Sequence, residues 1–90
     1  MKRLIVLAVL SAAAALAADP AGTLLGMTWR VFRGGKLIAV GQQTSPLRPD
    51  CTISARLRFN VVKGQTYIAT FALNDANGIE LNRRITIHGT

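Results

Sequence analysis

The chain has 90 residues, with 11 basic and 4 acidic ones and a formal net charge of +7, and it contains one histidine and one cysteine. These residues provide no combination of nucleophile, base and orienting group and no close pair of carboxylates, so the sequence predicts that the protein is not an enzyme. They also provide no second ligand at metal-binding spacing. We therefore expect no catalytic site, no metal and no cofactor.

The first 17 residues have the layout of a secretory signal peptide. Lys2 and Arg3 are followed by an apolar run that ends with small residues at Ala15 and Ala17. A signal peptidase is expected to cleave after Ala17, with Ala18 as the alternative. The run is shorter than the roughly 20 apolar residues that a membrane-spanning helix needs, so we expect no stable membrane span after cleavage. The expected organisation is a signal peptide helix followed by one exported domain, periplasmic or extracellular, over residues 18–90.

Removal of the signal peptide leaves nine basic residues against four acidic ones, which is a net charge of +5. In an exported protein this charge favours an acidic protein or an anionic polysaccharide or other envelope component as the partner. A domain of this size buries only about 60% of the surface that its unfolded chain exposes, and one cysteine cannot form an internal disulfide. The small core therefore also favours a homo-oligomer.

Alternating apolar residues predict a β-hairpin at the start of the domain. The inward face of its first strand is expected to hold Leu25, Met27, Trp29 and Val31. Two glycines at 34–35 supply a tight turn. The return strand, over 36–43, contains a continuous apolar run at 37–40, which indicates either burial on both faces or an edge that pairs with another chain.

Residues 44–50 contain two prolines, which predicts a loop that crosses from one sheet to another. The next strand, over 52–61, has the clearest alternation in the chain. Its inward row is expected to be Ile53, Ala55, Leu57, Phe59 and Val61. Cys51 is expected to begin this row as a buried, inert thiol, with an intermolecular disulfide or a catalytic thiol as the alternatives.

Residues 64–88 predict a second hairpin. Its apolar residues at period two are Tyr67, Ala69, Phe71 and Leu73 before the turn and Ile79, Leu81, Ile85 and Ile87 after it. Because the aromatic rings of this hairpin face inward, none is expected to stack on bases, and we expect no nucleic-acid partner. His88 falls on the outward face as a surface histidine. Residues 75–78 lack the later acidic ligand of a calcium loop and are expected to form a plain turn.

This hairpin resembles the last two strands of extracellular immunoglobulin-like modules, above all the PKD and bacterial Ig-like families and, more loosely, fibronectin type III domains. The matching residues are Gly64, Tyr67, Phe71, Asp75, Asn77 and Gly78. The resemblance implies a non-catalytic binding or spacer module outside the cell. Such sandwiches normally have seven strands, whereas five or six are predicted here. We expect an all-β, small antiparallel Ig-like β-sandwich, with a small OB-like barrel or a strand supplied by a partner as the alternatives.

Four arginines on outward strand faces form the candidate binding site: Arg30, Arg56, Arg58 and Arg84. If their strands lie in one sheet, they form a stripe that can make bidentate contacts with carboxylate, sulfate or phosphate groups. The alternative is a solvated surface that keeps a small domain soluble. The expected function is an exported non-catalytic binding or structural module. Its alternatives are a subunit of a surface assembly built by strand-mediated oligomerisation, and an inhibitor of a secreted enzyme that acts through residues 45–50.

Overall fold

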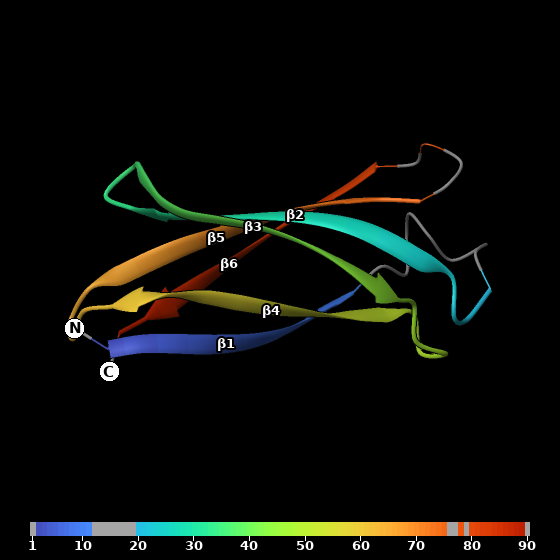
Figure 1. The fold of residues 1–90 in the computed structure, drawn as a ribbon, viewed down its shortest axis with the longest axis horizontal. Coiled ribbons are helices and arrows are strands. Elements are labelled where there is room, and N and C mark those ends of the chain that lie inside the picture. The colour runs from blue at the N-terminus through green and yellow to red at the C-terminus, as the bar shows by residue number, and fades with distance from the viewer. Residues whose placement is uncertain (1, 12–19, 76–77, 79, 90) are drawn as a thin grey trace.

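The structure, a computed structural model, describes residues 2–11, 20–75, 78 and 80–89. These residues form six strands and no helix, which confirms the predicted all-β, antiparallel fold (Figure 1). The strands are β1 (Lys2–Ser11), β2 (Leu24–Arg33), β3 (Lys36–Pro46), β4 (Thr52–Val61), β5 (Thr66–Asn74) and β6 (Glu80–His88). The described residues thus contain no helix long and apolar enough to cross a membrane.

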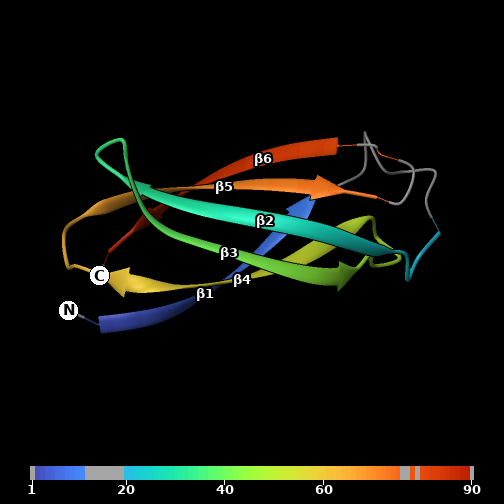
Figure 2. The same cartoon turned by 45° about the horizontal axis from the view of Figure 1, so that its top comes forward.

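The strands are arranged as two stacked antiparallel sheets. One has four strands in the order β3-β2-β5-β6, and the other pairs β1 with β4 (Figures 1 and 2). The connection from β3 to β4 passes from the larger sheet to the smaller one, as the sequence predicted, and the connection from β4 to β5 returns. Each sheet turns one row of apolar side chains toward the other, which is the construction of a β-sandwich.

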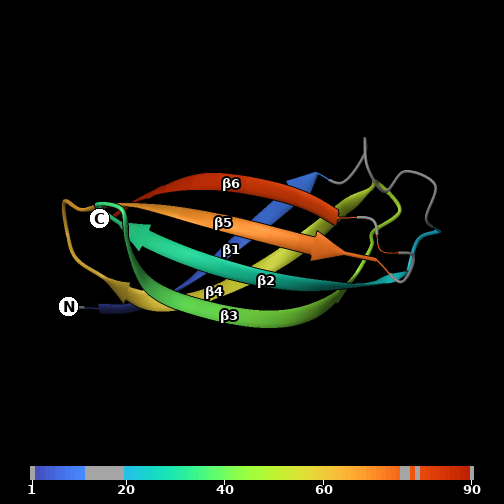
Figure 3. The same ribbon diagram turned by 90° about the horizontal axis from the view of Figure 1, so that it is seen from above.

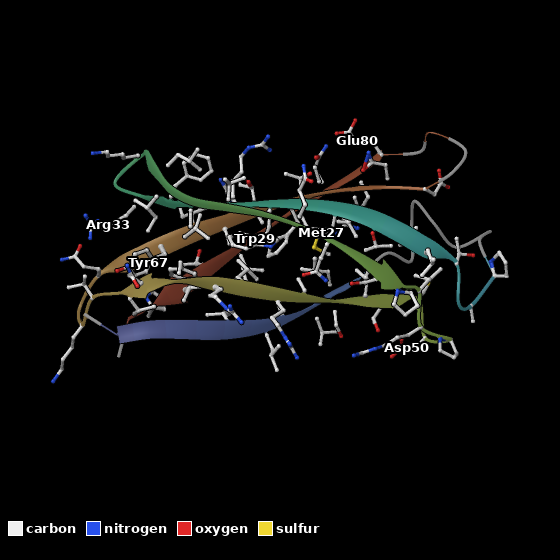
Figure 4. The ribbon with its side chains drawn as sticks, in the orientation of Figure 1. Met27, Trp29, Arg33, Asp50, Tyr67 and Glu80 are labelled. Carbon is white, nitrogen blue, oxygen red and sulfur yellow. The ribbon has the colours of Figure 1, made fainter. Side chains whose placement is uncertain are left out.

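The core is made by the inward rows that the alternation predicted. These rows are Leu25, Met27, Trp29 and Val31 of β2, Ile53, Ala55, Leu57, Phe59 and Val61 of β4, and Tyr67, Ala69, Phe71 and Leu73 of β5, all of them buried. Figure 4 shows Trp29 and Tyr67 between the two layers. The alternation of apolar residues alone therefore predicted the inner faces of β2, β4 and β5 correctly.

The N-terminal segment differs from its prediction. β1 pairs with β4 along its whole length, from Lys2 opposite Val61 to Ser11 opposite Thr52, where the sequence predicted the start of a signal peptide helix. The segment contains β-branched and large aliphatic residues that suit a strand, and β4 offers it an edge to pair with. The predicted cleavage site at Ala17 lies outside the described residues.

β3 is longer than predicted because it is an edge strand. It continues to Pro46, which pairs with Leu24 of β2, although residues 44–50 were expected to form a loop. Proline is tolerated there because the outer edge of β3 has no ladder to complete. Leu37 and Val40 are exposed by 48% and 58%, so the apolar run of β3 lies at an edge and is not buried on both faces.

The corner between β4 and β5 is held by Tyr67. The backbone N–H of Val62 donates a 2.7 Å hydrogen bond to the Tyr67 hydroxyl. The tyrosine ring also packs edge-on against Phe59, with the ring centroids 5.2 Å apart. One side chain of β5 therefore fixes both the end of β4 and the place where the chain changes sheet.

Cys51 corrects a further prediction. It lies in the turn before β4, is only half-buried, and has a positive φ of 65°. It therefore does not begin the buried row of β4. The turn places it outside the strand, where the alternation of β4 no longer applies.

Candidate functional site

The four predicted arginines lie on two opposite faces of the sandwich. Arg30 and Arg84 are on the outer face of the four-stranded sheet, whereas Arg56 and Arg58 are on the outer face of β4, in the other sheet. All four residues are exposed. The single stripe is therefore not formed, because the loop after β3 takes β4 to the opposite layer.

Arg30 and Arg84 are brought to either side of one threonine. Thr70 of β5 lies opposite Arg30 of β2 and opposite Arg84 of β6. Since neighbouring strands are about 4.8 Å apart, the backbones of the two arginines are roughly 10 Å apart. A depression of about 390 Å³ adjoins this row and is also lined by Ala72 and Asn82. This face offers two separated guanidinium groups beside a shallow depression.

On the other face, the loop before β4 adds a third arginine. The Arg48 guanidinium donates a hydrogen bond from Nη2 to Oγ of Ser54, which precedes Arg56 and Arg58 on the outward row of β4. Alternate residues of a strand are about 7 Å apart, so three cations follow one another along this face. We call Arg48, Arg56 and Arg58 the β4 arginine surface.

The turn between β3 and β4 positions Arg48. Its backbone N–H donates to the carbonyl of Thr52, and its carbonyl accepts from the N–H of Cys51, both at 2.9 Å. The Asp50 carboxylate, at the lower right of Figure 4, accepts from the Thr52 hydroxyl at 2.6 Å and from the Thr52 N–H at 3.2 Å. The hydroxyl bond lowers the pKa of Asp50 most, and the Thr52 N–H and the charge of Arg48 lower it further.

Gln43 of β3 holds β4 from the side opposite to β1. Its amide nitrogen donates to the carbonyl of Ser54 at 3.0 Å, and its amide oxygen accepts from the N–H of Arg56 at 2.9 Å. One side chain thus bonds two backbone groups of β4, as a neighbouring strand would. Sequence reasoning missed both Gln43 and Arg48, because neither role follows from the alternation of a single strand.

The predicted arginines are available for an external ligand. Among the described residues, the arginine side chains that donate hydrogen bonds are those of Arg48 and Arg83, to Ser54 and to the Asn82 carbonyl. The guanidinium groups of the four predicted arginines form neither a hydrogen bond nor an ion pair within this part of the chain. An anion that binds them therefore displaces no partner within the described residues.

The remaining polar candidates form no reactive cluster in the part of the chain that is described. His88 is exposed, with Nδ1 3.5 Å from the Thr66 hydroxyl. No group of three or more histidine, cysteine or acidic residues that could hold a metal ion occurs within residues 2–11, 20–75, 78 and 80–89. In the predicted turn, the N–H of Gly78 donates to the carbonyl of Asp75, while residues 76 and 77 lie outside the described part.

The chain was compared with protein-family models, with curated proteins and with solved structures. No family model matches the chain, and no match was found among the curated proteins or the solved structures.

Proposed function

We propose that residues 1–17 are removed on export and that the mature domain is a non-catalytic module that binds an acidic partner through the β4 arginine surface. The observation that carries this proposal is the row of Arg56 and Arg58 on one exposed strand face, extended by Arg48. A planar guanidinium makes paired hydrogen bonds to a carboxylate or sulfate group. Three such groups, two on β4 and one on the turn before it, suit a partner that carries repeated negative charges.

The tyrosine at the corner between the two sheets supports an immunoglobulin-like module. A tyrosine near the start of a strand, whose hydroxyl bonds to the backbone a few residues upstream at a corner between sheets, is typical of that architecture. Tyr67 has this position and bonds to Val62. A module of this kind outside the cell binds or supports other molecules, in agreement with the proposed role.

The test compares two double variants that change the net charge equally. Arg56→Glu/Arg58→Glu reverses charge on the β4 arginine surface, and Arg30→Glu/Arg84→Glu does so on the opposite face. Affinity for poly-glutamate and for dextran sulfate is measured by surface plasmon resonance at about 0.1 M salt. We expect at least a tenfold loss for the first variant and less than a threefold loss for the second.

Thermal unfolding of both variants should remain cooperative, because all four positions are exposed. An equal loss of affinity in the two variants would show that only overall charge matters. A larger loss in Arg30→Glu/Arg84→Glu would move the binding site to the four-stranded sheet. Either result contradicts the proposal.

A second candidate function, assembly through strand edges, is favoured by β3. This edge strand exposes Leu37 and Val40, and an exposed apolar edge is a surface for pairing with another chain. It predicts oligomers whose mass rises with protein concentration in light scattering. The double variant Leu37→Lys/Val40→Lys should be monomeric at the same concentrations.

The remaining candidate function, an inhibitor that acts through residues 45–50, receives less support. Leu47 is 2% exposed, its N–H donates to the carbonyl of Thr23, and its carbonyl accepts from the N–H of Gly22. The middle of the segment 45–50 is therefore packed into the domain. Pro46 and residues 48–50 are the exposed part of this segment, so a continuous exposed loop for insertion into another protein is only three residues long.

A further inference from the structure

β4 depends on β1 for the completion of the smaller sheet. The sheet consists of these two strands, and the other edge of β4 is bonded by the side chain of Gln43. Under the proposed function, on which this inference rests, export removes residues 1–17 and with them the whole of β1. The mature domain then keeps β4 as the single strand of its second layer.

The removal leaves a row of backbone groups without a partner. Backbone N–H and C=O groups of alternate residues point to opposite edges of a strand, and Gln43 bonds those of Ser54 and Arg56. The odd-numbered residues of β4, from Ile53 to Val61, therefore direct their backbone N–H and C=O groups toward β1. An edge of this length is a template for another strand.

The removal also uncovers apolar surface. Ala8 and Leu10 are 9% and 4% exposed and belong to the same core cluster as Leu73 and Leu81, and Val6 is half-buried against it. Figure 3 shows β1 running obliquely beneath β5 and β6. Without β1, an apolar groove lies beside β4 and below these two strands.

We propose that this groove binds an extended segment of another exported protein, antiparallel to β4, with aliphatic residues facing inward and carboxylates facing outward. The preference for aliphatic residues at inward positions follows from β1 itself, which fills the groove with Val6, Ala8 and Leu10. The preference for carboxylates at outward positions follows from the positive charge of Arg56 and Arg58. In the observed register Leu7 lies opposite Arg56 and Ile5 opposite Arg58, and opposite charges at directly paired positions stabilise a sheet.

A second copy of this chain fits the groove poorly. Its inward rows are already buried in its own core, and its first residues after the predicted cleavage site include Asp19, Pro20 and Gly22, which do not form an apolar strand. A centred antiparallel pair of two β4 strands sets Arg56 of each copy opposite Arg58 of the other. Like charges at directly opposite positions destabilise such a pair.

A polysaccharide also fits poorly, because a sugar chain does not reproduce the regular backbone ladder that β1 forms with β4 over ten residue pairs. The occupant that matches the edge, the apolar groove and the arginines together is a polypeptide strand with alternating aliphatic and acidic residues. Such binding by strand addition obtains its affinity from backbone hydrogen bonds and its selectivity from alternate side chains.

The test uses the protein processed during export and synthetic peptides based on residues 2–11. The acidic peptide carries Ile5→Glu and Leu7→Glu, the basic peptide carries Ile5→Lys and Leu7→Lys, and a third peptide adds Ala8→Asp and Leu10→Asp to the acidic one. Mass spectrometry first establishes that residues 1–17 are absent from the protein. Binding is then measured by isothermal titration calorimetry and by the shift in melting temperature.

We expect the acidic peptide to bind at least tenfold more tightly than the basic one and to raise the melting temperature, and the third peptide not to bind. In Arg56→Glu/Arg58→Glu the order of the acidic and basic peptides should reverse. If the processed protein is unfolded by itself, refolding with the acidic peptide should restore the near-ultraviolet circular dichroism of buried Trp29. The full chain with Ala15→Leu/Ala17→Leu, which keeps its leader, should bind no peptide.

Failure of all peptides to bind or refold the processed protein would overturn the inference, as would equal binding of the acidic and basic peptides. Retention of residues 1–17 in the exported protein would overturn it as well, because β1 then fills the groove. If the processed protein binds poly-glutamate through Arg56 and Arg58 but binds no peptide, the proposed function stands and this inference alone fails. If the acidic peptide binds and poly-glutamate does not, the groove is the site and charge alone does not define the partner.

Discussion

The indole ring of Trp29 lies directly over Gly41. The two residues are paired across β2 and β3, and a Cβ atom added to Gly41 would come within 2.2 Å of the Trp29 ring atom Cζ2. Trp29 is 6% exposed, so its large ring reaches the core only because the neighbouring strand has no side chain at this position. Gly41 is therefore required for packing and not for a turn.

Replacing Gly41 by alanine should destabilise the domain by about 1–3 kcal/mol, the usual cost of overpacking a core. The added methyl group forces the rigid indole to move, because Trp29 is enclosed between the sheets. Unfolding in urea, followed by the fluorescence of this single tryptophan, measures the change.

Gly26→Ala is the matched control. Gly26 also lies in β2, but no atom lies within 4 Å of the Cβ that would be added there. Removing the flexibility of a glycine within a strand should leave stability unchanged or raise it by up to about 1 kcal/mol. If both variants lost the same stability, the contact between Trp29 and Gly41 would not be the cause.

Tyr67→Phe should cost about 1–2 kcal/mol. The variant keeps the edge-on contact with Phe59 and loses only the hydroxyl that accepts the Val62 N–H, and a partly buried donor without its acceptor is costly. For a domain of this size the loss corresponds to roughly 4–8 °C of melting temperature for each kcal/mol. A wild-type melting temperature in Tyr67→Phe would show that the Val62 N–H finds another acceptor.

The inner faces of β2, β4 and β5 could be predicted because each depends only on the alternation within one strand. Which of the two sheets a strand joins depends on where the preceding loop leads the chain. For this reason the predicted arginine stripe does not form. Arg56 and Arg58 share a face because they are two residues apart. Arg30 is separated from them because the chain changes sheet after β3. The pattern of residues within one strand does not predict such a change.

The roles of Arg48 and Gln43 depend on contacts between segments and could not be read from periodicity. Arg48 reaches Ser54 from the turn, and Gln43 reaches the backbone of β4 from a neighbouring layer. The β-strand formed by residues 2–11 was missed for a different reason. Its composition suits both the helix of a signal peptide and a strand, and pairing with β4 determines the outcome in the structure.

Cys51→Gly should be more stable than Cys51→Ala by about 0.5–1 kcal/mol. Cys51 has a φ of 65°, a conformation that costs a side-chain-bearing residue about 1–2 kcal/mol, and the greater freedom of glycine in the unfolded chain offsets part of the gain. Both variants lack the thiol, so the comparison isolates the backbone. Equal melting temperatures of the two variants in the presence of reductant would contradict strain at this turn.

Asp50 should make stability depend on acid pH. Its pKa lies below the ordinary value of 3.8 because its carboxylate accepts hydrogen bonds from Thr52 and lies near Arg48. A carboxyl group whose pKa is lowered by folding stabilises the folded state fully above its unfolded pKa, and this contribution is lost as the pH falls through the folded pKa.

Asp50→Asn keeps an acceptor for the Thr52 groups but carries no charge, so its contribution does not titrate. The melting temperature of the wild type should exceed that of Asp50→Asn at pH 6, and the two should converge as the pH falls from about 4 toward 2. Thr52→Val removes the hydroxyl that lowers the pKa most and should move the convergence to higher pH. A difference between wild type and Asp50→Asn that stays constant from pH 6 to pH 2 would show that the charge of Asp50 does not stabilise the turn that positions Arg48.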